Sequence, residues 1–196
     1  MKKLLPIFLI LLLASPCHAW MSSVLCGGGV AGASACASGT ADQGNAISDS
    51  GYAISTTAIA GQSFQVTSNG SKLYSITVKT KGTANGAATL TLRYGTEENL
   101  GTYLGSKQVS DTWALDTDKT VEFVIQDTTN TFNAGTAYYF AILSSATNVS
   151  VYYKQSAPND PYANGRAYNT SSAADWSLVG HEDPANDLGF LIKVCN

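Results

Sequence analysis

The sequence predicts an all-β protein in which two antiparallel sheets pack as a sandwich, with a jelly-roll-like arrangement of strands. Three observations lead to this fold class: short segments of alternating apolar and polar residues, turn-forming residues between those segments, and no convincing amphipathic helical stripe. An alternation with a period of two is what a strand with one buried face produces. Eight or nine such segments at this spacing predict two packed antiparallel sheets.

Six segments alternate clearly, and each would bury about three large side chains. These segments are residues 73–79, 87–94, 121–126, 138–143, 149–154 and 188–194. Three shorter strands are expected at residues 52–59, 62–66 and 102–109. Residues that tolerate a positive φ separate the strands, at positions 69–70, 85–86, 133–135 and 164–165.

The alternation also predicts which side chains share a face of the sheet. In the first clear segment, Tyr74 is expected on the core-facing side together with Ile76 and Val78. In the second, the face opposite the apolar residues comprises Thr89, Thr91 and Arg93.

Residues 1–19 have the pattern of a signal peptide, with Lys2 and Lys3 followed by an apolar stretch at 4–14. That stretch is too short to cross a bilayer, which takes about 20 apolar residues. Small residues at Cys17 and Ala19 place the cleavage after Ala19. A lipidated Cys17 is the competing interpretation, and the proline directly before that cysteine argues against it. The expected location is secreted, periplasmic or cell-surface.

Charge and hydropathy exclude two classes of partner. Removing the two N-terminal lysines leaves 9 basic residues against 14 acidic ones, a net charge of about −5, with no basic cluster. Binding to a phosphate backbone needs such a cluster, so nucleic acid is not an expected partner. No second apolar run is long enough to span a bilayer, so the chain is not expected to be an integral membrane protein.

Residues 20–50 read as a Gly/Ala/Ser-rich leader before a sandwich domain at residues 51–196. Three cysteines follow the cleavage site, and an oxidising compartment favours a disulfide. The simplest pair is Cys26 with Cys36, which would close a short glycine-rich loop. The alternative joins Cys195 to one of these two cysteines, and the sequence does not decide between them.

A series of short motifs resembles the choice-of-anchor type of exported β-sandwich domain, and is also similar to phage tail-associated modules. The motifs lie at Gln62–Phe64, 73–78, 134–140, 162–168, Trp176 and 187–190. The resemblance spans about residues 55–194 and rests on the order and spacing of these motifs. It implies a non-catalytic module of a kind that is often joined to a separate cell-surface anchor, and it carries over no active-site residues.

Exposed aromatic rings with nearby amide, carboxylate and guanidinium groups are a typical arrangement for binding sugars. The candidate ligand-binding residues are Trp113, Trp176, Tyr152, Tyr162, Asn164, Arg166 and Tyr168. The alternative is that these rings pack over the ends of the sandwich as part of its hydrophobic interior.

Calcium binding and histidine-dependent catalysis are the other two kinds of site to consider. Asp183 and Asp187 are candidate calcium ligands, because calcium takes carboxylates in flexible numbers, but ordinary turn chemistry explains them as well. His181 is the one histidine after the cleavage site, so a histidine-dependent mechanism would have to use it. No recognised catalytic motif is present.

We therefore expect an exported, non-catalytic module with no required cofactor, binding glycan or protein at the cell surface or outside the cell in an adhesive role. The alternatives are a structural subunit of an extracellular matrix or appendage, and a carbohydrate-active enzyme.

Overall fold

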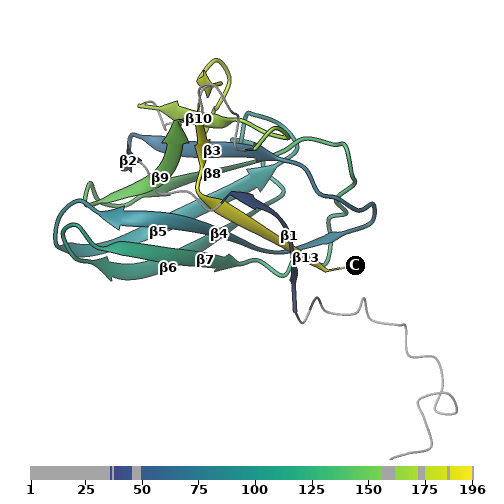
Figure 1. Cartoon of the computed structure of the whole chain (residues 1–196), viewed down its shortest axis with the longest axis horizontal. Coiled ribbons are helices and arrows are strands. Elements are labelled where there is room, and N and C mark those ends of the chain that lie inside the picture. Colours follow the sequence, from purple (N-terminus) through teal and green to yellow (C-terminus); the bar gives the residue numbers. More distant parts are fainter. Residues whose placement is uncertain are drawn as a thin grey trace, which may run out of the picture. The chain divides into compact units, whose positions relative to one another are not determined.

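The computed structural model describes residues 36, 38–45, 50–155, 162–171, 175–184 and 186–195, all within the compact unit Ala35–Asn196. The described residues form thirteen strands and no helix. The strands build two antiparallel sheets that pack against each other, which confirms the predicted sandwich (Figure 1).

Each sheet draws strands from distant parts of the chain. Sheet A has seven strands: β1 (Thr40–Asn45), β2 (Ser50–Ile54), β4 (Lys72–Gly82), β7 (Asp118–Val124), β9 (Val149–Gln155), β12 (Asn186–Leu188) and β13 (Phe190–Cys195). Sheet B has six strands: β3 (Ile59–Phe64), β5 (Gly86–Gly95), β6 (Gly105–Trp113), β8 (Tyr138–Ser144), β10 (Ala167–Thr170) and β11 (Glu182–Asp183). The order across sheet B is β11-β10-β3-β8-β5-β6, which leaves β6 at one edge.

Apolar side chains that alternate along the strands fill the space between the sheets. Phe140 of β8 and Phe190 of β13 are 0% and 4% exposed, and their ring centroids lie 5.7 Å apart across the interior. The ring of Tyr162 packs edge-on against Phe190 at 5.0 Å. Each such side chain contributes about 1.5–3 kcal/mol relative to exposure to water, so this contact between layers holds the fold.

The predicted orientation of Tyr74 is wrong, because β4 contains a β-bulge. The pairing with β13 passes from Ser75–Lys193 directly to Leu73–Val194, so Tyr74 is the extra residue. The extra residue of a bulge shifts by one position which side chains of the strand face the core. Leu73 is consequently fully buried in the core, whereas Tyr74 is half-buried.

The sandwich begins earlier than the predicted boundary at residue 51. Strand β1 (Thr40–Asn45) pairs with β13, from Thr40 opposite Val194 to Asn45 opposite Phe190. Asp42 also accepts hydrogen bonds from the backbone N–H and the hydroxyl of Thr67. The polar, glycine-containing sequence of β1 lacks an alternating pattern, so the sequence alone does not indicate a strand there.

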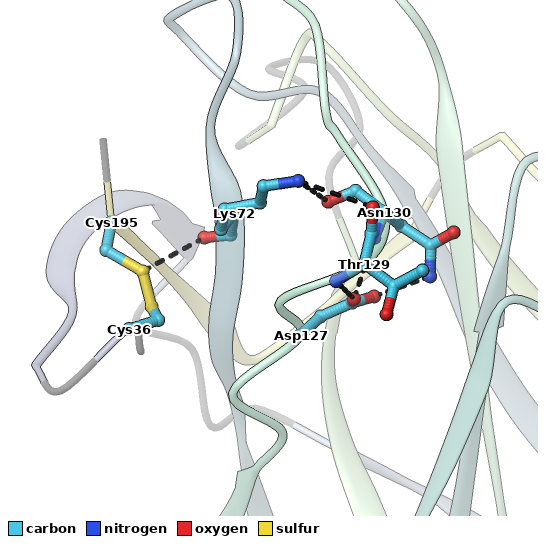
Figure 2. The surroundings of a disulfide bond; sticks show 6 residues. All are labelled: Cys36, Lys72, Asp127, Thr129, Asn130 and Cys195. Carbon is cyan, nitrogen blue, oxygen red and sulfur yellow. Dashed lines mark hydrogen bonds between the residues drawn. A yellow bond between two sulfur atoms is a disulfide. The ribbon is translucent and has the colours of Figure 1, made fainter. Parts of the chain in front are cut away.

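The disulfide joins Cys36 to Cys195, whose Cα atoms lie 5.9 Å apart (Figure 2). The preferred pairing of Cys26 with Cys36 is therefore wrong, and the alternative that uses Cys195 is confirmed; Cys26 lies outside the described residues. The pairing follows from the sheet. β1 and β13 are antiparallel neighbours, so Cys36, four residues before the start of β1, lies beside the end of β13.

A polar loop is anchored to the first residue of β4, close to the disulfide (Figure 2). The Lys72 ammonium donates to the carbonyl oxygen of Asn130 at 3.0 Å and to the hydroxyl of Thr131 at 2.9 Å. The buried carboxylate of Asp127 accepts hydrogen bonds from the Thr129 N–H, from the backbone and side-chain N–H groups of Asn130, and from the Tyr94 hydroxyl, all at 2.8–2.9 Å.

These bonds determine how Asp127 titrates. Burial favours the neutral acid, but the hydrogen bonds from Asn130, Tyr94 and Thr129 outweigh it and hold the pKa of Asp127 below its ordinary value. Asp127 therefore stabilises the fold above its unfolded-state pKa, and this stabilisation is lost as pH falls through the lower folded-state pKa.

Among the described residues, no helix is long and apolar enough to cross a membrane.

Replacing both Cys36 and Cys195 with serine should lower the free energy of unfolding by about 2–5 kcal/mol, because the bond closes a loop with a sequence separation of 159 residues. Urea denaturation followed by intrinsic fluorescence measures the change. Cys26→Ser is the matched control and should leave the unfolding midpoint in place. An equal loss in Cys26→Ser would contradict the assigned pairing.

Asp127→Asn should lower the free energy of unfolding at neutral pH by about 1–3 kcal/mol, because an amide cannot accept all the bonds that the carboxylate accepts. The difference from wild type should shrink below about pH 4, where the unfolded chain protonates this group. Asp116→Asn is the control, since its ion pair with Lys81 is exposed and contributes little. A constant difference at all pH values would refute the role assigned to the charge.

Candidate functional site

Two loops cover part of the outer face of sheet B. Residues 96–104 connect β5 to β6, and residues 175–181 lead into β11. The loops pair with each other: the Leu100 N–H donates to the Trp176 carbonyl at 3.1 Å, and the Leu178 N–H donates to the Glu98 carbonyl at 2.9 Å. These hydrogen bonds hold the two loops against the sheet, although neither loop forms a regular strand there.

A second apolar cluster lies under these loops, separate from the core between the sheets. Its buried members are Ile59, Leu100, Ala141, Tyr168, Trp176 and Leu178. Gly61 of β3 lets the cover approach closely, since a Cβ there would lie 2.9 Å from Leu178. The outer face of sheet B is thus apolar and covered over β3, β8 and β10.

The guanidinium of Arg93 is held between two aromatic rings at the margin of this cover. Its central carbon lies 4.3 Å from the ring centroid of Trp176 and 4.5 Å from that of Tyr103, and it donates to the Leu100 carbonyl at 3.2 Å. Cation–π contacts of this kind fix ring orientation as well as adding stability. Trp176 is buried, whereas Tyr103 is 43% exposed. Tyr103 is therefore an ordered aromatic ring with an accessible surface.

Trp176 adopts the left-handed backbone conformation, with φ of 57°. A bulky residue is rarely found there, and the conformation costs about 1–3 kcal/mol. Packing in the second cluster and the contact with Arg93 offset that cost. The strained backbone serves to hold the indole ring under the guanidinium.

Beyond Arg93 the outer face of sheet B is polar and open to solvent. Core-facing residues of β5 alternate with Thr89 and Thr91, and the register places these opposite Ser110 and Gln108 of β6. We call this surface the polar strip, and it comprises Thr89, Thr91, Ser106, Gln108, Ser110 and Thr112. It follows β5 and β6, which lie side by side (Figure 1).

Cross-strand hydrogen bonds order the strip. The hydroxyls of Thr89 and Ser110 lie 2.8 Å apart, and the Gln108 amide donates to the Thr91 hydroxyl at 3.0 Å. Each group retains further hydrogen-bonding capacity, because a hydroxyl both donates and accepts and a primary amide has two N–H groups. A shallow hollow of about 370 Å³ lies at the end away from Tyr103, where its lining includes Thr112 and Ser145.

The strip itself carries no formal charge. Lys107 and Asp111 of β6 pair with Leu92 and Ala88, which are core-facing residues of β5, so their side chains leave β6 on the opposite face. Asp111 nevertheless contributes to the lining of the hollow. Asp111 is also in an ion pair with Lys119 at 2.5 Å. Among the side chains of β5 and β6 on the strip's own face, the one cation is Arg93, which is half-buried between the two rings.

The aromatic rings expected to bind a ligand are buried, which corrects the predicted site. Trp113, Tyr152, Tyr162, Tyr168 and Trp176 are all at most 8% exposed. Such rings leave no free face for stacking, so the alternative of packing is the one that the structure shows.

The polar tips of these rings have partners in the protein. The Trp113 indole donates to the Thr80 hydroxyl at 3.1 Å, and the Tyr162 hydroxyl accepts from the Gln65 N–H at 3.0 Å. Burial raises the pKa of Tyr162 to about 12. The Tyr168 hydroxyl donates to Glu98 at 3.1 Å.

Tyr152 lies on another face of the sandwich, in sheet A, where its hydroxyl donates to Asp118. That hydrogen bond raises the pKa of Tyr152 to about 12. The expected residues therefore do not form one surface.

Asn164 and Arg166 are exposed as expected, but neither accompanies an exposed ring from the predicted set. The Arg166 guanidinium pairs with Glu182 at 2.8 Å.

The expected calcium ligands act as hydrogen-bond acceptors inside the protein. Asp187 accepts from the Gln62 amide at 2.8 Å and from the Tyr162 N–H at 3.1 Å. Asp183 accepts from the Tyr52 hydroxyl and from the Asn186 amide at 2.6 Å. In the described part of the chain, no three His, Cys, Asp or Glu side chains gather where they could hold a metal ion.

A groove of about 510 Å³ lies over sheet A, lined by β1, β4 and β13 together with Thr120. Its charged side chains already have partners: Lys79 lies 3.5 Å from Asp118, and Asp42 binds Thr67. Among the described residues, no exposed large hydrophobic side chain lines this groove or the hollow on sheet B, but the exposed ring of Tyr103 contacts Arg93 on the face of the polar strip. We therefore place the candidate site on sheet B, although its hollow is the smaller one.

Sequence reasoning missed Tyr103 as a site residue. It assigned Thr89, Thr91 and Arg93 to the face opposite the core, which the structure confirms. The contact between Arg93 and Tyr103 depends on how that loop folds back over the sheet, and no local pattern encodes it.

Comparison with known proteins adds no relative: no family model matches the sequence, and no curated protein matches it.

Proposed function

We propose that this chain is an exported, non-catalytic β-sandwich module that binds glycan through Tyr103 and the polar strip. The observation that carries the proposal is the exposed Tyr103 ring, held by Arg93 at the end of a neutral surface of hydroxyl and amide groups. A sugar presents apolar C–H faces and polar hydroxyl edges. An ordered ring beside hydrogen-bonding side chains complements both.

Rigidity favours binding at this place. Tyr supplies a large contact area with few rotatable bonds, and its cation–π contact restricts those bonds further. The loop that carries Tyr103 is fixed by its pairing with residues 176–178. Less conformational freedom is therefore lost when a ligand binds, which increases affinity.

Export is supported by the N-terminal pattern at residues 1–19 and by the disulfide between Cys36 and Cys195, since such bonds persist in oxidising compartments. The resemblance to exported choice-of-anchor domains points to the same location and to a surface role. We include secretion or cell-surface display in the proposal on these grounds.

A binding role is favoured over turnover by the composition of the strip. Hydrolysis of a glycosidic bond requires two opposed carboxyl groups. The six side chains of the strip supply hydroxyl and amide groups alone. His181 lies elsewhere, where a ring nitrogen is 3.3 Å from the Thr170 hydroxyl.

Tyr103→Ala should weaken glycan binding by about tenfold or more, equivalent to about 1.4 kcal/mol, because the stacking surface is lost. Tyr103→Phe should retain most of the affinity, since it keeps the ring. Binding is measured first on a glycan array and then by calorimetry with the glycans that bind.

Leu115→Ala is the control, since it removes another exposed apolar side chain outside the strip. A folded Tyr103→Ala protein that binds glycan as well as wild type would rule out the site. A chain that binds no glycan and instead self-associates would favour the alternative of an assembly subunit.

A further inference from the structure

We infer that the ligand of the polar strip is an extended, uncharged glycan that lies parallel to β5 and β6, from Tyr103 to the hollow beside Thr112. This inference rests on the proposed function and adds the class, direction and length of the ligand. Three properties of the surface carry it: its shape, its lack of charge and its ordered hydrogen-bonding groups.

The shape of the strip fits a chain better than a single sugar. Ser106 and Thr112 are six residues apart on β6, a span of about 20 Å at about 3.3 Å per residue. The strip is only two strands wide, and strands lie about 4.8 Å apart. A long, narrow and shallow surface offers few contacts to a compact ligand and many to an extended one.

The strip has a different feature at each end. Tyr103 lies at one end, because its ring contacts Arg93, which is opposite Ser106. The hollow of about 370 Å³ lies at the other end, with Thr112 and Ser145 in its lining. The Ser145 hydroxyl accepts a hydrogen bond from the Thr89 N–H at 2.9 Å, which fixes this serine beside the strip. A bound chain would therefore lie along the line that joins these two ends.

The charges around the strip disfavour an acidic glycan. Arg93 is enclosed by Tyr103 and Trp176, and Lys107 belongs to the opposite face of β6. Asp111 contributes a carboxylate to the lining of the hollow at the other end. A carboxylated or sulfated chain would meet this carboxylate at the hollow and no cation among the six side chains of the strip, while the half-buried Arg93 is already engaged by two rings and the Leu100 carbonyl. The cost of desolvating its charges would therefore not be offset.

The side chains in the middle of the strip are already positioned. The Thr89–Ser110 and Thr91–Gln108 pairs hold each other at 2.8 and 3.0 Å, at successive same-face positions of the two strands. Same-face positions along a strand are about 6.6 Å apart. Donors and acceptors therefore recur at a regular interval along the strip, which suits a polymer with a regular repeat.

The experiment compares oligosaccharides of increasing length. The probes are linear β-1,4-, β-1,3- and α-1,4-glucan and β-1,4-mannan oligosaccharides of roughly two to eight units, with polygalacturonate as the charged polymer. We expect an uncharged series to bind with an affinity that rises with chain length and then levels off once the chain spans about 20 Å.

Two variants test whether a bound chain extends from Tyr103 to Thr112. Thr112→Ala should weaken binding of the long oligosaccharides by about 3- to 10-fold, the effect of one lost hydrogen bond, and leave the shortest ones unchanged. Tyr103→Ala should weaken both. Thr120→Ala is the matched control, an exposed strand threonine on sheet A that should change neither.

The outcomes separate this inference from the proposed function. If polygalacturonate alone binds and Tyr103→Ala abolishes its binding, the site stands and the uncharged ligand is wrong. If an uncharged series binds without a length dependence or an effect of Thr112→Ala, the extended mode is wrong. If no glycan binds, or if Tyr103→Ala has no effect, both the site and this inference are overturned.

Discussion

Contact between apolar side chains of the two sheets is the constraint on which the rest of the structure depends. Phe140 and Phe190 meet at 5.7 Å in the interior, and the alternation along every long strand supplies their neighbours. Because one face of each sheet is used in this way, the outer faces, edges and loops are what can meet a partner. The candidate site accordingly lies on an outer face.

The outer face of sheet B has two parts: a covered apolar part that stabilises the fold, and an open polar part that we propose binds the ligand. Over β3, β8 and β10 it is apolar and is covered by two paired loops, with Gly61 allowing their close approach. Over β5 and β6 it is polar and open. Arg93 lies at the boundary, where it joins the buried Trp176 to the exposed Tyr103. The cover thus orders the aromatic ring that we propose as the main contact with glycan.

Features that depend on residues close together in the sequence were predicted well. Features that depend on pairing with distant segments were not. The strands at 87–94 and 138–143 were predicted nearly to their ends, because one buried face imposes a period of two on any such segment. The bulge at Tyr74 and the polar strand Thr40–Asn45 were missed, since each depends on pairing with β13. In the site, the polar face of Thr89, Thr91 and Arg93 was predicted, whereas the role of Tyr103 was not.

The sequence by itself determined the fold class, most of the long strands and, away from the bulge at Tyr74, the face of each that meets the core, because hydrophobic alternation is a local property. Only the tertiary structure decided the partner of Cys36 and the exposure of the aromatic rings. Both depend on which distant segments become neighbours: Cys195 lies beside Cys36 because β13 pairs with β1. Trp176 is buried and Tyr103 exposed because two loops far apart in the chain fold over the same sheet.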